Sequence, residues 1–208
     1  MPTFFHHLKR KTLTLFNRLS DLAIFVGLVL VGGLASSWYM VSVGSPLLTT
    51  HSIGPWVTWT AEGRGDADPY TRAHFARSGT LNLSTELAGT YVASQDSDGM
   101  RLHSSCEYSI KGKEIDARWW SISVFDDAGR LIPNPAERYS FTSDTVVVEP
   151  DNAFTVTLAR DARPGNWLPT GGGGRLTLVL AVVEAARPVI NGEVVDISLP
   201  RIERVACR

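Results

Sequence analysis

Residues 119–124, WWSISV, alternate bulky and small or polar side chains with a period of two, and this pattern predicts the fold of the C-terminal part of the chain. Successive side chains of an extended strand point to opposite faces. Trp120, Ile122 and Val124 would then share one face, while Trp119 lies on the other. Similar alternation recurs in residues 106–111, 154–159 and 176–182. The pattern indicates several strands, each with one face in a core.

Turn-forming residues separate these runs. They are expected at residues 98–99, 127–130, 133–135 and 164–166. Connections this short join antiparallel neighbours, and no rhythm of alternating strands and helices is visible. The predicted fold is therefore mainly β, a jelly-roll-like antiparallel β-sandwich. Residues 69–78, PYTRAHFARS, predict one short helix, since Pro69 suits a first helical turn and Gly79 a C-terminal stop.

An uninterrupted apolar segment precedes this domain. Residues 22–41, LAIFVGLVLVGGLASSWYMV, contain no charged side chain over 20 positions. A helix of this length spans about 30 Å, the thickness of the hydrocarbon layer of a bilayer. Trp38 and Tyr39 lie near its end, where amphipathic rings prefer the headgroup region. We predict a single transmembrane helix over residues 22–43.

The distribution of basic residues predicts the orientation of this helix. Four basic side chains precede it: Lys9, Arg10, Lys11 and Arg18. No Lys or Arg occurs between Val43 and Gly63. The positive-inside rule then makes residues 1–21 a cytoplasmic tail and places the rest of the chain outside.

A cleaved signal peptide is the alternative interpretation of the same segment. Small-residue runs at 33–37 resemble a cleavage site. The apolar run continues beyond them, however, and exceeds the ~7–15 residues of a signal peptide's apolar region, which favours a retained anchor. In both cases the remainder is exported. Glycine and proline predict a linker over residues 44–65, followed by the β-sandwich domain over 66–208.

Charge and cysteine content narrow the possibilities for the exported part. After residue 21 the chain holds 16 basic and 20 acidic residues, a net charge of −4, so it offers no basic footprint for nucleic acid. Its two cysteines are Cys106 and Cys207. Thiols oxidise in an exported compartment, so we favour a disulfide between these two over the alternative of two independent thiols.

Familiar catalytic patterns do not occur in the sequence. There is no nucleophile elbow, zinc-protease helix or phosphate-binding glycine loop. The acidic runs at 96–99 and 126–129 are typical of turns, and His74 and His103 are the only histidines within the predicted domain. These patterns imply no metal and no cofactor, and they argue more against an enzyme than for one.

Aromatic and polar residues supply the candidates for contact with a ligand or partner. Trp119 and Trp120 lie side by side in the predicted strand, and Asn166-Trp167 opens the distinctive string NWLPT. Each tryptophan is open to two interpretations, a packed corner of the sandwich or an aromatic wall of a binding site. Tyr70 and Arg72, in the predicted short helix, complete the set of candidates.

Several ordered motifs resemble one bacterial family. They are Asp68-Pro69-Tyr70-Thr71-Arg72-Ala73, Cys106-Glu107-Tyr108, Ala117-Arg118-Trp119-Trp120, Asn166-Trp167-Leu168-Pro169 and Leu199-Pro200-Arg201-Ile202 through Cys207. Together they cover roughly residues 54–208 and resemble Domain of Unknown Function 1214. The resemblance implies a jelly-roll-like domain that follows a second domain, Domain of Unknown Function 1254, in longer relatives. Residues 1–53 are too short to hold that companion, which suggests a stand-alone, membrane-anchored form.

Three functions are compatible with this sequence. The first is a non-catalytic periplasmic subunit, held in the bacterial inner membrane, that pairs with a separately encoded exported protein carrying the companion domain. The second is a module that binds carbohydrate or another small ligand through its aromatic residues. The third is an enzyme that is active only with a partner subunit. We expect them in that order.

Overall fold

The protein is described here from a computed structural model of the 208-residue chain, which describes residues 2–185, 189–190, 193–194 and 197–208. Two compact units follow one another along the chain, with their boundary between Leu48 and Thr49. Each unit is described by itself below.

The first unit is helical. Helix α1 (Pro2–Tyr39) continues into one turn of π-helix, η1 (Met40–Gly44), and then into the short helix α2 (Ser45–Thr49). The change to π-helix occurs where the Ser42 hydroxyl donates a hydrogen bond to the Trp38 carbonyl at 2.6 Å. Within this unit, the 27 residues Arg18–Gly44 are long and apolar enough to cross a bilayer. Such a helix suits a membrane anchor or a signal sequence.

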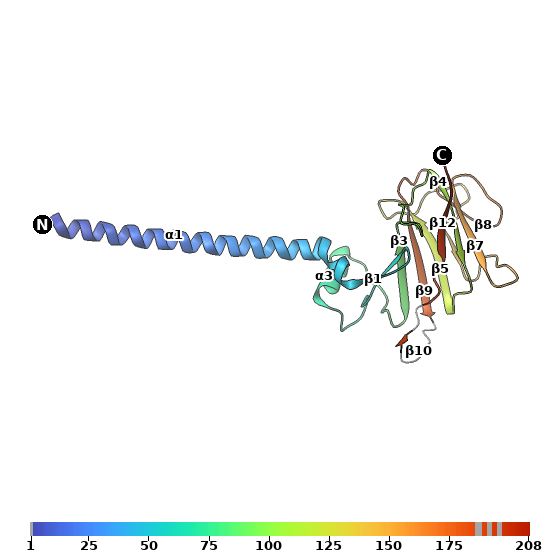
Figure 1. Cartoon of the computed structure of the whole chain (residues 1–208), viewed down its shortest axis with the longest axis horizontal. Coiled ribbons are helices and arrows are strands. Elements are labelled where there is room, and N and C mark those ends of the chain that lie inside the picture. The colour runs from blue at the N-terminus through green and yellow to red at the C-terminus, as the bar shows by residue number, and fades with distance from the viewer. Residues whose placement is uncertain (1, 186–188, 191–192, 195–196) are drawn as a thin grey trace. The chain divides into compact units, whose positions relative to one another are not determined.

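The second unit is a β-sandwich, which confirms the predicted fold class (Figure 1). The first sheet has the order β1 (Thr50–Ile53), β2 (Trp56–Trp59), β3 (Ala88–Ala93), β9 (Thr177–Ala185), β5 (Ala117–Phe125) and β6 (Ser140–Thr142). The second has the order β12 (Arg201–Cys207), β4 (Cys106–Gly112), β7 (Phe154–Ala159) and β8 (Asn166–Pro169). A separate pair joins β10 (Val189–Ile190) to β11 (Glu193–Val194).

The alternation in WWSISV forms β5 as predicted. Trp120, Ile122 and Val124 point into the core with 5% or less of their surface exposed, while Trp119 is half-buried on the outer side. The Trp120 ring stacks on Phe154 of the opposite sheet, with ring centroids 4.8 Å apart, so this pair joins the two layers. Removing a large apolar side chain from water stabilises the folded state by roughly 1.5–3 kcal/mol. The core contains such side chains from both sheets.

Strand direction differs from the prediction at one place. The sandwich was expected to be antiparallel, but β7 and β8 run parallel, with Val156 opposite Asn166 and Ala159 opposite Pro169. The six residues 160–165 carry the chain back along β7 before β8 begins. A loop of this length covers the three-residue return that the register requires, so no helical crossover is needed.

Residues 44–65, predicted as a linker, contain the hairpin of β1 and β2. Gly54, in the left-handed conformation at φ 57°, and Pro55 form only its turn, with Ile53 opposite Trp56. Trp56 has 1% of its surface exposed, and its indole N–H donates to the Pro200 carbonyl at 2.7 Å. The breaker residues therefore mark a two-residue turn within the sheet rather than the end of regular structure.

The short helix α3 spans Pro69–Ser78, the predicted residues. The carboxylate of Asp68 caps its start by accepting hydrogen bonds from the backbone N–H groups of Tyr70 and Thr71. Gly79 ends it at φ 70°. The helix packs on Trp59 of β2 through His74, with the two ring centroids 4.4 Å apart.

Candidate functional site

Charged side chains are absent from the middle of the outward face of the first sheet, and the exposed ion pair Arg118–Glu184 lies at one end of β5 and β9. We define this outer face by the outward positions of its three central strands: Ala88, Thr90 and Val92; Trp119, Ser121, Ser123 and Phe125; Thr177, Val179, Ala181 and Val183. All are half-buried. The register sets them in rows across the sheet, with Trp119 and Ala88 on either side of Val183. Small and apolar side chains thus cover this face.

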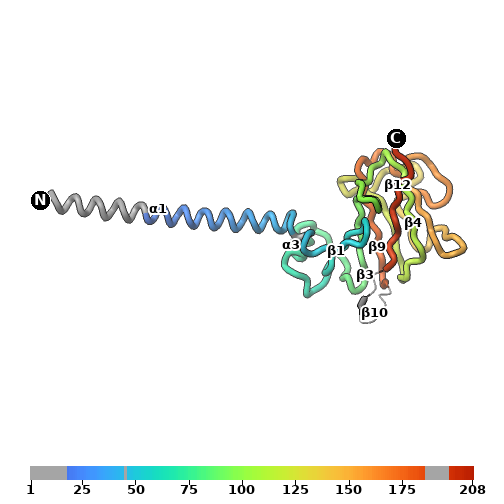
Figure 2. The backbone as a smooth tube through the Cα atoms, in the orientation of Figure 1, coloured from blue at the N-terminus to red at the C-terminus, as the bar shows by residue number. Residues whose placement is uncertain are grey.

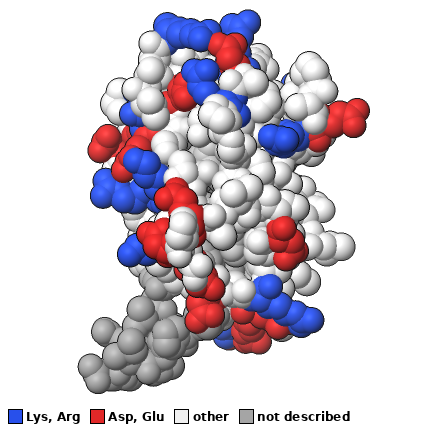
Figure 3. All heavy atoms as spheres, turned by 90° about the vertical axis from the view of Figure 1, so that its right-hand side faces the viewer, with Lys and Arg blue, Asp and Glu red and all other residues white. Residues whose placement is uncertain are grey.

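The second sheet differs on its outward side. There Lys111 pairs with Glu203 at 2.7 Å, and Arg163 pairs with Glu107 at 2.6 Å. Figure 3, seen from the side of β7 and β8, shows acidic and basic side chains distributed over that face. Depletion of charge is therefore a property of the first sheet and not of the domain as a whole. Depletion of charged residues is characteristic of the central part of protein interfaces.

The two adjacent tryptophans predicted as candidates lie in different environments. Trp120 has 5% of its surface exposed and belongs to the core. Trp119 lies on the outer face, opposite Val183 of β9. Only Trp119 is placed to contact a partner, because the pleat of β5 sends its neighbour inward.

Asn166 and Trp167 hold the sandwich together at β8. The Asn166 side chain is buried, accepts from the Val147 N–H at 2.8 Å, and donates to the Val147 and Thr155 carbonyls. Trp167 is half-buried, and its indole N–H donates to the Ala159 carbonyl at 3.0 Å. Trp167 and Trp119 belong to different sheets, so the candidate tryptophans do not converge on one binding site.

Helix α3 forms one wall of a cleft of about 610 Å³. Apolar side chains dominate its lining, with Ala67, Phe75 and Leu81 among them, and Arg72 supplies a cation. Among the described residues, no carboxylate forms an ion pair with Arg72. Tyr70, on the first turn of the same helix, is 39% exposed.

A buried carboxyl group lies beside this cleft, where the sequence predicted a linker. Glu62 has 3% of its surface exposed and accepts a hydrogen bond from the Asn82 side-chain amide. Burial raises the pKa of Glu62, and the hydrogen bond from Asn82 partly offsets this effect. The burial of Glu62 could not be predicted from the residues next to it in sequence. The groups that enclose Glu62 come from residues 82–85.

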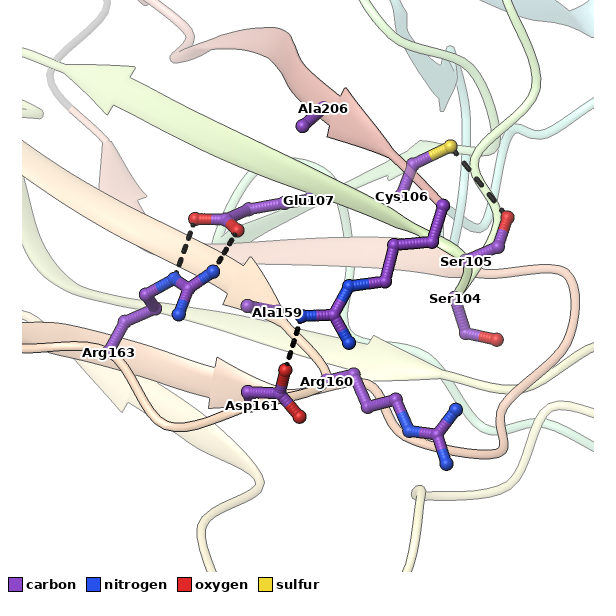
Figure 4. A pocket seen from close by; sticks show the side chains of 10 residues that line it. Ser104, Ser105, Cys106, Glu107, Ala159, Arg160, Asp161, Arg163 and Ala206 are labelled. Carbon is purple, nitrogen blue, oxygen red and sulfur yellow. Dashed lines mark hydrogen bonds and ion pairs between the residues drawn. The ribbon is translucent and has the colours of Figure 1, made fainter.

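A second recess, of about 280 Å³, is lined by arginine and acidic side chains (Figure 4). Arg163 donates two hydrogen bonds to the Glu107 carboxylate, at 2.9 and 2.6 Å, and Arg208 pairs with Asp161 at 2.6 Å. The hydrogen bonds from Arg163 hold the pKa of Glu107 below its usual range. Arg160 adds a third guanidinium to the lining. Three cations against two carboxylates leave the recess with a positive charge.

The cysteines meet at the edge of this recess. Cys106 and Cys207 face one another across β4 and β12 and form a disulfide, with their Cα atoms 3.9 Å apart and a sequence separation of 101. Figure 2 shows the C-terminal strand β12 lying beside β4 from the middle of the chain. Of the two interpretations of the cysteines, the structure contains the disulfide.

The acidic side chains and histidines that an active site would require each interact with a different neighbouring residue. Asp96 is 2% exposed and pairs with Arg204 at 2.8 Å, and Asp126 pairs with Arg130 at 3.0 Å. His103 interacts with Ser105, and His74 stacks on Trp59. Throughout the described part of the chain, no three His, Cys, Asp or Glu side chains are grouped to hold a metal ion.

The protein belongs to the class in which an N-terminal apolar helix is followed by a β-sandwich domain. Residues 88–186 match the family described as "Protein of unknown function (DUF1214)", which confirms the resemblance found in the sequence motifs. The match to this family covers 99 of the 208 residues of the chain, all of them within the second unit.

A known structure shares the fold. The VPA0106 protein from Vibrio parahaemolyticus is 21% identical, with a TM-score of 0.62 over 87% of this chain and 45% of its own length. This chain thus spans less than half of that protein. An uncharacterised protein from Burkholderia cenocepacia is 15% identical, with a TM-score of 0.41 over 58% of this chain and 30% of its own. No curated protein matches the sequence.

Proposed function

We propose that this protein is a non-catalytic subunit of the bacterial envelope that pairs with a second exported protein through the outer face. Its N-terminal helix anchors it in the inner membrane, with the N-terminus in the cytoplasm and the β-sandwich in the periplasm. The partner is a separately encoded protein that carries the companion domain. The observation that supports pairing most directly is the absence of charged side chains from the outer face, with the ion pair Arg118–Glu184 confined to one end of β5 and β9.

The physical basis is the different chemistry of the two outward faces. Water-facing strands normally carry charged or polar side chains, as the second sheet does with its ion pairs. The outer face instead combines Trp119, Val179 and Val183 with small side chains. A surface of this kind suits a partner of matching shape and apolar character. The longer Vibrio parahaemolyticus protein supports the same view, because its fold match leaves more than half of that chain without a counterpart here.

Location in the envelope is supported by two independent features. The first is the apolar helix Arg18–Gly44 with its preceding basic residues. The second is the disulfide between Cys106 and Cys207, a bond that persists in oxidising compartments.

Copurification with outer-face variants tests the pairing. The full-length protein is isolated from its host membrane in mild detergent, and copurifying proteins are quantified by mass spectrometry. Val183→Arg places a charge beside Trp119, so we expect recovery of the partner to fall at least tenfold, equivalent to about 1.4 kcal/mol or more. Thr157→Arg, on the outward side of the second sheet, is the control and should retain the partner. Isolation of the wild-type protein without any stoichiometric partner would contradict the proposal.

The α3 cleft favours a second candidate function, the binding of a small ligand. Its apolar lining and its guanidinium suit a molecule with an apolar body and one anionic group. Decanoate is a suitable probe, with binding measured by calorimetry. We expect Arg72→Ala to weaken binding, whereas Arg77→Ala, on the same helix but outside the cleft lining, should leave it unchanged. Equal binding by both variants, or none by the wild type, would exclude this site.

A further inference from the structure

The loop between α3 and β3 exposes three leucines. Leu81, Leu83 and Leu87 have 102%, 61% and 57% of their surface exposed, within seven residues. We define this segment, residues 79–87, as the leucine loop. Single exposed leucines are common on protein surfaces, but three on one short loop form a local apolar projection.

The backbone of the leucine loop is nonetheless held firmly by the domain. The N–H of Thr85 donates to the Glu62 carbonyl at 2.9 Å, and the Asn82 side chain donates to the Glu62 carboxyl group. A Cβ added to Gly63 would lie 2.5 Å from the Leu83 carbonyl oxygen, so the two backbones are in close contact. The loop is thus fixed while its leucine side chains point outward.

These contacts place the leucine loop near the first residue of the domain. The N–H of Thr60 donates to the Thr49 carbonyl at 3.0 Å, and Glu62 follows only two residues later. Thr49 and Thr85 are therefore both bonded to the short segment 60–62. In sequence, β1 precedes the segment 60–62 and α3 follows it. Figure 1 shows β1 and α3 lying together on one side of the β-sandwich.

The length of chain between the apolar helix and the domain is equally short. The apolar stretch ends at Gly44, and β1 begins at Thr50. The five residues 45–49 extend at most ~17 Å, whatever the arrangement of the two units. If the helix spans the membrane as proposed above, the leucine loop is restricted to a short distance from the bilayer surface.

We propose that the leucine loop docks on the bilayer that holds the anchor, with its leucine side chains inserted at the boundary between headgroups and acyl chains. Apolar insertion, rather than attraction to anionic headgroups, is the interaction that the local charges support. Arg64 is already paired with Asp66 at 2.6 Å and with Glu86 at 3.7 Å, so its charge is compensated within the domain. Docking should consequently be insensitive to salt, because screening weakens only charge interactions.

Depth-dependent quenching in nanodiscs tests this inference on the full chain. Both native cysteines are in the disulfide, so Leu83→Cys supplies a single thiol for an environment-sensitive NBD fluorophore. The nanodiscs contain phosphatidylcholine, a minor fraction of phosphatidylglycerol and a lipid with a shallow 5-doxyl quencher. We expect roughly twofold quenching, at low and at high salt, from a label at the depth of an interfacial apolar side chain.

Ala128→Cys is the matched control. Ala128 lies in the turn after β5, and the register places Phe125 opposite Thr177 while Ala88, which follows the leucine loop, lies opposite Val183 near the other end of β9. A label there should not be quenched. The triple variant L81S/L83S/L87S, labelled through Thr80→Cys, should lose the quenching that Thr80→Cys alone shows.

The possible outcomes separate this inference from the function on which it rests. An unquenched Leu83 label in protein that remains in the nanodisc would overturn docking, and would reassign the leucines to a protein partner. Protein that fails to enter nanodiscs would overturn both the anchor and docking. Pairing through the outer face is measured independently, by copurification of the Val183→Arg variant.

Discussion

Glu62 is a carboxyl group almost completely enclosed by protein, in a domain whose other carboxylates are mostly exposed or paired with arginine. Desolvation disfavours its charged form, and the hydrogen bond from Asn82 recovers only part of that loss. The segment that encloses it is the leucine loop. The protonation of Glu62 is therefore linked to the stability of the region that we propose to meet the membrane.

The pH dependence of stability should report this group. Because the folded pKa of Glu62 is raised above the ordinary value of 4.5, the wild type has its full stability below that value and loses part of it as pH rises through the folded pKa. Glu62→Gln removes the charge but keeps the oxygen that accepts from Asn82. Thermal unfolding of both proteins should agree near pH 4 and diverge toward about pH 8, with the variant more stable. Parallel curves would show that Glu62 does not titrate differently in the folded state.

The disulfide is the second feature at the scale of single residues. It joins strands that the chain order separates by 101 residues, so it restricts a long loop in the unfolded state. We expect Cys106→Ser with Cys207→Ser to lower the free energy of unfolding by about 2–4 kcal/mol in urea titrations. Wild-type protein under reducing conditions should behave like the variant. Two reactive thiols in the oxidised wild type would contradict the bond.

Helix α3 is the element whose sequence and structure agree most closely. Asp68 accepts hydrogen bonds from the Thr71 hydroxyl and from the backbone N–H groups of Tyr70 and Thr71. The bond from the Thr71 hydroxyl, and after it the two backbone bonds, hold the pKa of Asp68 below its ordinary value. Each of these contacts is local to the first turn. The same helix lines the cleft and packs on Trp59, so its stability also bears on the proposed ligand site.

Removal of this cap should have a moderate effect. We expect Asp68→Ala to lower the free energy of unfolding by about 1 kcal/mol, because two N–H groups lose their acceptor. Asp68→Asn, which retains a capping oxygen, should lose considerably less. Chemical unfolding monitored by tryptophan fluorescence provides the measurement. An equal loss in both variants would assign the effect to charge rather than to capping.

At the scale of the sheet, the outer face combines segments that lie far apart in the chain. Residues 88–92, 119–125 and 177–183 meet there, and none of their outward positions is charged. Each strand alone resembles any half-buried strand. Only their adjacency produces a continuous surface, which is why the sequence motifs identified Trp119 but not the surface to which it belongs.

The whole molecule separates into an apolar helix and a domain with its own core. Every member of the buried core cluster, from Trp56 to Ile202, belongs to the second unit. We therefore expect residues 49–208, expressed without the helix, to fold cooperatively and to show the circular dichroism of a β-protein. The disulfide should form in this fragment after export to an oxidising compartment. If residues 49–208 were insoluble alone and soluble only when joined to the helix, the core of the second unit would be incomplete.

Local patterns in the sequence determined the elements. Alternation placed Trp120, Ile122 and Val124 on one face of β5, and the proline and glycine at its ends delimited α3. The long apolar run produced the N-terminal helix. These features were predictable because strand alternation, helix capping and apolar length depend on residues that are neighbours in sequence.

Only the tertiary structure decided how these elements meet. The hairpin at residues 50–59, the parallel pairing of β7 with β8, the enclosure of Glu62 and the register that brings Cys106 opposite Cys207 all depend on contacts between distant segments. Strand order and register are set by packing of the complete sandwich, and no single segment encodes its neighbour. The same physical reason applies to the uncharged outer face and to the leucine loop, both of which exist only once the chain has folded.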